Sequence, residues 1–254
     1  MSAAGRLPGR VCVVTGAHGG IGAATVELFR KEGAVVIGVD LLGDSPGDRA
    51  LEADVTSEEQ VQEMFATVRR DYGRIDVLFN NAGISPTDDG SVLDTTLEAF
   101  ERVQSVNLRS VFLCCKHGIP HLLENQGPSR GSVINTASFV AVMGAATSQI
   151  SYTASKGGVL ALSRELGVEF ARRGVRVNAL CPGPVDTPLL RELFAKDPER
   201  AARRLVHVPM GRFAHAEEIA RAALFLASED SSYVTASTFL VDGGLSGAYT
   251  TPLD

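Results

Sequence analysis

Tyr152 and Lys156 are the pair of residues whose types and spacing most directly suggest acid/base chemistry. They lie four positions apart at the start of a stretch with a helical pattern, and this spacing places both side chains on one helix face. A phenol has a pKa near 10, so ionising it at pH 7 costs about 4 kcal/mol. A nearby ammonium group lowers that pKa, which would let Tyr152 exchange a proton with a hydroxyl or carbonyl group. Alternatively, the pair is a core tyrosine beside a surface lysine.

A glycine-rich turn near the N-terminus is a second candidate site. Gly16, Gly20 and Gly22 follow the apolar run Val11–Val14 and precede a helical stretch that continues to Lys31. Glycines at a strand-to-helix turn let a pyrophosphate approach the backbone, and the helix directs free N–H groups and its positive dipole end at the phosphates. The alternative is a tight turn that needs glycine only for positive φ. The position at the first such turn favours dinucleotide binding.

Asp40 indicates which dinucleotide is bound. It ends the second apolar run, about 20 residues after the glycines, where a carboxylate can accept a hydrogen bond from the ribose 2′-hydroxyl. A 2′-phosphate ~4 Å from this carboxylate would be repelled by about 4 kcal/mol at an effective dielectric of ~20, roughly a thousandfold in affinity. No Arg or Lys lies in 17–20 or directly after Asp40 to offset that repulsion. The sequence therefore predicts NAD(H) and disfavours NADP, unless Asp40 is a solvated loop residue.

The elements that must position these residues alternate between short apolar runs and longer helical patterns. Because strands that are apolar throughout are buried on both faces, this alternation predicts an α/β fold with a parallel sheet covered by helices. We expect one domain over 1–254, since no repeat, linker or low-complexity tract interrupts the chain. The expected strands are Val11–Val14, Ala34–Val39, Ile75–Phe79, Ser132–Thr136, Val175–Leu180 and Thr238–Val241, and the expected helices are Ser57 to about Arg70, Leu97–Leu123, Tyr152–Arg172 and Glu217–Ala227.

Composition excludes several classes of partner. The 254 residues carry a net charge of −6, with no dense block of Lys and Arg, so we expect no nucleic-acid partner. No apolar run approaches the ~20 residues that span a bilayer, so we expect no membrane partner and a cytoplasmic location. The four cysteines make no C-x-x-C pair and have no histidine at metal-ligand spacing, which predicts reduced thiols and no metal site.

Several motifs in the same order resemble those of the short-chain dehydrogenase/reductase family, particularly the branch that includes 3-oxoacyl-carrier-protein reductases. They are Thr15-Gly-x-x-x-Gly20-Ile21-Gly22, Asn80-Asn81-Ala82-Gly83, Tyr152-x-x-x-Lys156 and Pro182-Gly183. The resemblance covers essentially the whole chain. It implies a Rossmann-type, doubly wound parallel sheet of about seven strands with helices on both faces.

The resemblance also implies a role for each matching residue. The implied catalytic set is Asn107 holding a relay water, Ser138 bonding the substrate oxygen, Tyr152 as acid/base, and Lys156 binding the nicotinamide ribose and lowering the Tyr152 pKa. The implied cofactor contacts are Gly16, Gly20, Ile21, Gly22, Asp40, Leu41, Asp54, Val55, Asn81, Ala82, Gly83, Tyr152, Lys156, Pro182, Gly183, Val185 and Thr187.

Simpler explanations exist for four of these residues. Asn107 could be a buried polar residue that distorts a helix, Ser138 a turn serine, Asp54 a loop residue, and Thr187 an N-cap before Pro188. The sequence also departs from the family pattern at one point. Ser138 and Tyr152 are 14 positions apart, one more than the commonest family spacing, which suggests a different loop on the substrate side.

The substrate side is expected to include a lid over about 186–209, because so long a connection is usually functional. An amphipathic helix packed on the core is the alternative. The predicted substrate contacts are Ser138, Val140, Gln149, Tyr152, Leu189 and Leu190. The family resemblance implies a homotetramer, and the apolar run 111–115 fits either its interface or the core.

These features together predict an NAD(H)-dependent oxidoreductase that interconverts a secondary alcohol and a ketone, with a small-molecule substrate and Tyr152 as general acid/base. A 3-oxoacyl-thioester reductase acting on a carrier-protein or CoA substrate is the alternative within the same chemistry. A non-catalytic nucleotide-sensing protein on the same fold is a third possibility, since fold alone does not determine function. It is disfavoured because this chain keeps both Tyr152 and Lys156.

Overall fold

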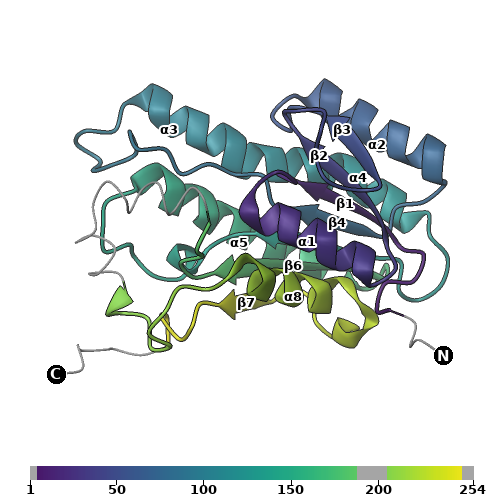
Figure 1. The fold of residues 1–254 in the computed structure, drawn as a ribbon. Helices are drawn as coiled ribbons and strands as arrows, with labels where there is room; N and C mark the ends of the chain where they lie inside the picture. The colour runs from purple at the N-terminus through teal and green to yellow at the C-terminus, as the bar shows by residue number, and fades with distance from the viewer. Residues whose placement is uncertain (1–4, 188–204, 248–254) are drawn as a thin grey trace.

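A wholly parallel sheet organises the structure, a computed structural model that describes residues 5–187 and 205–247 (Figure 1). Within these residues seven strands pair in the order β3-β2-β1-β4-β5-β6-β7. They are β1 Val11–Thr15, β2 Val35–Asp40, β3 Arg49–Glu52, β4 Val77–Asn80, β5 Gly131–Thr136, β6 Val175–Pro182 and β7 Thr238–Val241. The order runs outward in both directions from β1 and β4, so the doubly wound Rossmann-type fold is confirmed.

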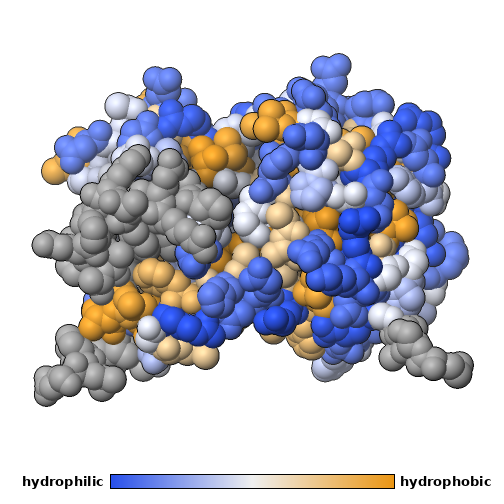
Figure 2. All heavy atoms as spheres, in the orientation of Figure 1, coloured by the Kyte–Doolittle hydropathy of each residue, from blue (hydrophilic) through white to orange (hydrophobic). Residues whose placement is uncertain are grey.

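Helices cover both faces of the sheet (Figure 1). Helices α1 and α8 pack on one face, and α2, α4 and α5 pack on the other. The surface shown over α1, α2 and α8 is mostly hydrophilic, with hydrophobic residues in small separate groups (Figure 2). The helices are α1 Gly20–Lys31, α2 Glu58–Tyr72, α3 Leu97–Gln104, α4 Ser110–Leu123, α5 Ile150–Ala171 and α8 Ala216–Ala227.

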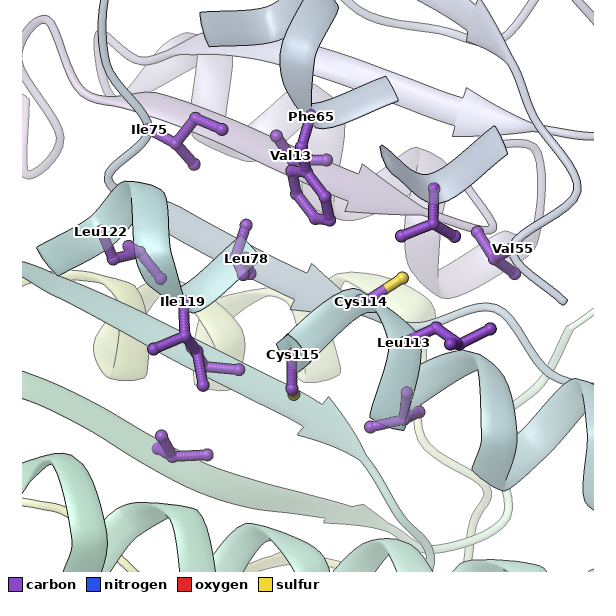
Figure 3. Packing of buried hydrophobic residues seen from close by; sticks show 14 of the residues in the cluster. Val13, Val55, Phe65, Ile75, Leu78, Leu113, Cys114, Cys115, Ile119 and Leu122 are labelled. Carbon is purple, nitrogen blue, oxygen red and sulfur yellow. The ribbon is translucent and has the colours of Figure 1, made fainter. Parts of the chain in front are cut away.

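The central strands contribute side chains to two cores, one on each face of the sheet. Val11 and Val13 of β1 point into the core beneath α2, α4 and α5, whereas Cys12 and Val14 point into the core beneath α1 and α8. This two-residue alternation is the ordinary period of a strand. Figure 3 shows the first core, where Phe65 of α2 and Ile119 of α4 pack against the sheet. The prediction of a sheet covered on both faces is therefore confirmed.

The apolar run 111–115 belongs mainly to this core rather than to an interface. Val111, Leu113, Cys114 and Cys115 of α4 are buried within the chain, and only Phe112 is substantially exposed, at 47%. All four cysteines lie in the described residues and are free and buried. Burial raises the pKa of the Cys115 thiol to about 12, which keeps it protonated.

Two elements were missed from the sequence. Strand β3 at Arg49–Glu52 is an edge strand with no fully buried residue, so it lacks the apolar run by which the other strands were recognised. The expected single helix 97–123 contains a turn of π-helix at Ser105–Arg109 between α3 and α4. Such turns are frequent at functional sites because they displace the residues they carry. Here the displaced segment carries Asn107.

Most of the predicted lid, 186–209, lies outside the described residues, and so do Leu189 and Leu190. The single domain over 1–254 stays a prediction. In the part of the chain that the structure describes, no helix is both long enough and apolar enough to cross a membrane.

Candidate active site

The glycine-rich turn joins β1 to α1 in a conformation that requires glycine. Gly16 has φ of +65°, and a Cβ at this position would lie 2.8 Å from the Ala82 Cα. A Cβ on Gly22 would lie 2.0 Å from the Gly16 carbonyl oxygen. Helix α1 begins at Gly20 and continues with Ile21, and its N-terminus has no side-chain cap. Uncapped N–H groups beside a glycine-rich turn fit a pyrophosphate.

A second loop is fastened to this turn by hydrogen bonds. The Thr15 hydroxyl accepts from the backbone N–H groups of Asn81 and Ala82 at 3.0 and 3.1 Å. The Asn81 side chain donates to the carbonyl oxygens of Thr15 and Gly16, both at 3.3 Å. The predicted cofactor residues Asn81–Gly83 therefore lie directly beside the glycine-rich turn. The two loops meet where the strand order reverses between β1 and β4, which is where dinucleotides bind in this architecture.

Asp40 ends β2 beside the same turn. Its carboxylate accepts from the backbone N–H of His18 at 3.0 Å and of Leu41 at 2.8 Å, so its position is set by the turn itself. The predicted adenine pair lies further along the edge. The Asp54 carboxylate accepts from the Thr56 N–H and hydroxyl, both at 2.8 Å, which is the local loop role offered as the alternative. Val55 is 8% exposed and packs in the core.

Asn107 on the π-helical turn is fully buried and held by protein groups. Its Oδ1 accepts from the Ile84 N–H at 2.7 Å, and its Nδ2 donates to the Ile84 carbonyl at 2.9 Å and to the Ser155 hydroxyl at 3.1 Å. Asn107 thereby fastens the loop after β4 to helix α5. This is the structural role offered as the alternative, and the water-holding role stays a prediction.

Ser138, Tyr152 and Lys156 come together at the carboxyl end of β5. The Ser138 side chain lies close enough to the Tyr152 phenol to lower its pKa. Lys156 lies one turn along α5, with its Nζ 5.6 Å from the centre of the Tyr152 ring. This Nζ donates to the Thr136 carbonyl at 2.7 Å, and the lysine is only 3% exposed. A Cβ on Gly83 would come within 3.4 Å of the Lys156 Nζ, so the trio adjoins the predicted cofactor loop.

Burial shifts both titrating groups of this trio toward their neutral forms. Burial raises the pKa of Tyr152 above its ordinary value, although the nearby Ser138 side chain acts in the opposite direction. Burial also lowers the pKa of Lys156 to about 8. The sequence led us to expect a lowered Tyr152 pKa. In the structure the net direction is opposite, because loss of solvent destabilises the phenolate more than the Ser138 side chain stabilises it.

The remaining predicted cofactor residues follow β6. Pro182 ends that strand, and a Cβ on Gly183 would lie 2.7 Å from the Asp242 Cα, so only glycine fits beside β7. Val185 pairs with Ala214, and the Thr187 N–H donates to the Val185 carbonyl at 2.8 Å. This segment leads directly into the predicted lid.

The segment after Ser138, which includes the predicted substrate contact Val140 and forms one wall of the expected substrate site, is only partly accessible. Val140 is 3% exposed, whereas its neighbours Val142 and Met143 are 42% and 39% exposed. Gln149 is half-buried just before α5 and gives that helix no side-chain cap. Any apolar contact on this wall would therefore be made mainly by Val142 and Met143. No group of acidic, His or Cys side chains in the described ranges could hold a metal ion.

Sequence reasoning missed Asp89, which lies in the loop after β4. Its carboxylate accepts from the N–H groups of Ser151 and Tyr152, 62 and 63 residues further along the chain. No local pattern connects an acidic loop residue to so distant a helix, and only the fold brings them together.

Comparisons with known proteins agree with this arrangement. The model of a family described as Enoyl-(Acyl carrier protein) reductase matches residues 16–246. The chain is 40% identical to 3-oxoacyl-[acyl-carrier-protein] reductase FabG of Thermotoga maritima, covering 94% of this chain and 99% of that one. It is 38% identical to 3beta-hydroxysteroid dehydrogenase 1 of Eggerthella lenta, covering 94% of each.

A solved structure supports the same assignment. A short-chain dehydrogenase/reductase from Burkholderia xenovorans superposes with a TM-score of 0.90 at 33% identity, covering 97% of this chain and all of that one. Fold, motif order and sequence identity therefore lead to one conclusion: this chain belongs to the short-chain dehydrogenase/reductase family of oxidoreductases.

Proposed function

We propose that this chain catalyses the NAD(H)-dependent interconversion of a secondary alcohol and a ketone, with Tyr152 as the general acid/base. The observation that carries the proposal is the trio at the sheet edge. Ser138 lies close enough to Tyr152 to influence its pKa, and the Lys156 Nζ lies 5.6 Å from the Tyr152 ring. A nicotinamide cofactor held by the adjoining glycine-rich turn would supply or accept the hydride.

The two hydroxyl groups would act on one substrate oxygen. In the reducing direction, Ser138 and Tyr152 both donate hydrogen bonds to the carbonyl oxygen, and Tyr152 transfers its proton to that oxygen as the alcohol forms. In the oxidising direction Tyr152 takes the proton back. The Lys156 Nζ lies 5.6 Å from the Tyr152 ring, and its charge would favour the phenolate that forms during reduction.

The choice of NAD(H) over NADP(H) is proposed from Asp40. Its carboxylate is held against the glycine-rich turn by the His18 and Leu41 N–H groups, at the end of β2. A carboxylate there accepts a hydrogen bond from the ribose 2′-hydroxyl and repels a 2′-phosphate.

The decisive experiment replaces Tyr152 by Phe, which removes only the hydroxyl. General acid/base catalysis contributes about 10²- to 10⁴-fold, so Tyr152→Phe should lower kcat by at least about a hundredfold. NADH affinity, measured by fluorescence titration, should stay within about threefold of the wild type, because the glycine-rich turn is unchanged. The matched control is Tyr233→Phe, since Tyr233 is fully exposed and far along the chain. Wild-type turnover in Tyr152→Phe would refute the proposal.

A 3-oxoacyl-thioester reductase is the second candidate, favoured by the identity to the Thermotoga maritima enzyme and by the description of the matching family. Steady-state kinetics on simple ketones and on a 3-oxoacyl-CoA would separate the two substrate classes. A kcat/KM at least about tenfold higher for the thioester would support this candidate, and the reverse ratio would support the simple ketone. Tight NADH binding without turnover of either class would instead support the nucleotide-sensing alternative.

A homotetramer is proposed for the assembled enzyme, as the family resemblance implies. The elements expected at its interfaces are α4, α5 and β7, and each carries an exposed apolar side chain. These are Phe112 of α4, Val168 of α5 and Leu240 of β7, which are 47%, 72% and 42% exposed. Light scattering after size-exclusion chromatography would measure the mass directly, and a monomer at micromolar concentration would contradict this assembly.

A further inference from the structure

The N-terminus of helix α5, which carries Tyr152 and Lys156, is not capped by its own flanking residues. Gln149 occupies the N-cap position and makes no side-chain hydrogen bond to the helix. The first N–H groups of a helix have no partner within the helix and need one elsewhere. In α5 these groups belong to Ile150, Ser151 and Tyr152, so the cap of this helix directly concerns Tyr152.

The loop after β4 provides the missing partners. The Gly90 carbonyl accepts from the Ile150 N–H at 3.2 Å. The two carboxylate oxygens of Asp89 are divided between the next two groups: Oδ1 accepts from Ser151 at 2.9 Å, and Oδ2 accepts from Tyr152 at 2.8 Å. Asp89 is 7% exposed, so these bonds are shielded from water. A negative charge at a helix N-terminus also interacts favourably with the helix dipole.

The loop that carries Asp89 is hydrogen-bonded to neighbouring elements. The Gly90 N–H donates to the Thr95 hydroxyl at 3.0 Å, just before α3. Asn107 holds Ile84 at the start of the same loop. The Gln104 side chain donates to the Ser151 carbonyl at 2.9 Å, so α3 also contacts this end of α5. The loop is therefore a fixed support for the helix.

The position of the phenol depends on this support. Ser138 follows β5, whereas Tyr152 belongs to the first turn of α5, so the two side chains stay close together only if that turn stays in place. A helix end without caps frays, and a shift of ~1 Å in a reacting group can lower a rate by about a hundredfold.

We propose that Asp89 is a positioning residue for Tyr152, acting by capping the first turn of α5 from the loop after β4. This inference rests on the proposed function, because it assigns to Asp89 a role in setting the geometry of the proposed acid/base. Asp89 does not itself contact the reacting atoms.

The test compares Asp89→Ala and Asp89→Asn with Asp88→Ala. Asp88 is the adjacent loop residue; it is exposed, and its carboxylate accepts from Arg102 at 2.7 Å, on helix α3 and not on α5. Both alanine variants remove one negative charge from the same loop, but only Asp89→Ala uncaps the helix. Asp89→Asn keeps the shape and one acceptor oxygen, so it should retain one of the two bonds.

We expect kcat to fall by about 10- to 100-fold in Asp89→Ala and by less in Asp89→Asn, while Asp88→Ala keeps wild-type kcat. The dissociation constant of NADH should change by less than about threefold in all three variants, because the glycine-rich turn is not involved. Hydrogen exchange at the amides of residues 151 and 152 should accelerate by at least about tenfold in Asp89→Ala and not in Asp88→Ala.

A kcat for Asp89→Ala within twofold of Asp88→Ala would overturn the inference, even if stability fell, because the cap would then be structural only. Unchanged exchange at residues 151 and 152 would overturn it as well. If Asp89→Ala does not fold, the kcat and exchange of Asp89→Asn decide by the same criteria. Tyr152→Phe separates this inference from the proposed function, since wild-type turnover there refutes the acid/base role, while the exchange rates report the cap independently of catalysis.

Discussion

Replacement of the buried Lys156 by Met should change how the stability of the protein depends on pH. The lysine is 3% exposed, and burial lowers its pKa from 10.5 to about 8. Between these values the unfolded chain binds a proton that the folded protein does not bind. The free energy of unfolding therefore gains a contribution that rises with pH across this window. Below pH 8 the folded state bears the full cost of holding a buried ammonium group.

The magnitude follows from the two pKa values. Each unit is worth ~1.36 kcal/mol, so the wild type should gain about 3 kcal/mol relative to Lys156→Met between pH 7 and pH 10.5. The Thr136 carbonyl, which loses its donor in the variant, contributes a constant offset of about 1–3 kcal/mol that cancels from this difference. Titrating groups that do not interact with Lys156 are common to both proteins and also cancel.

Urea unfolding followed by circular dichroism, at fixed protein concentration and at several pH values, would measure the difference. Lys31→Met is the matched control, because Lys31 is an exposed helix residue paired with Glu27. The difference in free energy of unfolding between the wild type and Lys31→Met should stay constant with pH to within about 1 kcal/mol. A difference in free energy of unfolding between the wild type and Lys156→Met that also stayed constant with pH would refute the reasoning. The folded protein would then not lower the pKa of Lys156.

Two further predictions concern the cofactor site. Asp40→Asn should remove most of the discrimination against NADPH, which the charge repulsion sets at about a thousandfold in affinity. Fluorescence titration would compare the dissociation constants of NADH and NADPH. Tighter binding of NADPH than of NADH by the wild type would contradict this prediction. Gly22→Ala should weaken NADH binding by more than about tenfold, because its Cβ would lie 2.0 Å from the Gly16 carbonyl oxygen and force the turn open. Gly144→Ala is the control and should bind NADH normally, because a Cβ there meets nothing within 4 Å and the φ of Gly144 is not positive.

Much of the fold could be predicted because its signals are local. A strand buried on both faces is mostly apolar, and β1 and β2 show this directly in the chain, whereas β6 also buries the polar residues Arg176 and Asn178. Strand β3 at Arg49–Glu52 could not be found in this way, because an edge strand has fewer buried positions. Its pairing with β2 depends on the folded arrangement and leaves no local pattern in the sequence. The π-helical turn at Ser105–Arg109 lies within an otherwise continuous helical pattern, so the sequence did not distinguish it from α-helix. The residues that bond Asn107 are distant in the sequence.

The sequence by itself determined which groups are available for chemistry and roughly where they lie. A strand, a glycine-rich turn and a helix are adjacent in the chain, and Tyr152 and Lys156 share a helix face because they are four positions apart. The tertiary structure decided how those groups behave. Burial moves the pKa values of Tyr152 and Lys156 toward the neutral forms, and Asp89 caps the helix from 62 residues away. The reason is physical: desolvation and capping depend on which atoms surround a group in space, and the surrounding atoms come from parts of the chain that only folding brings together.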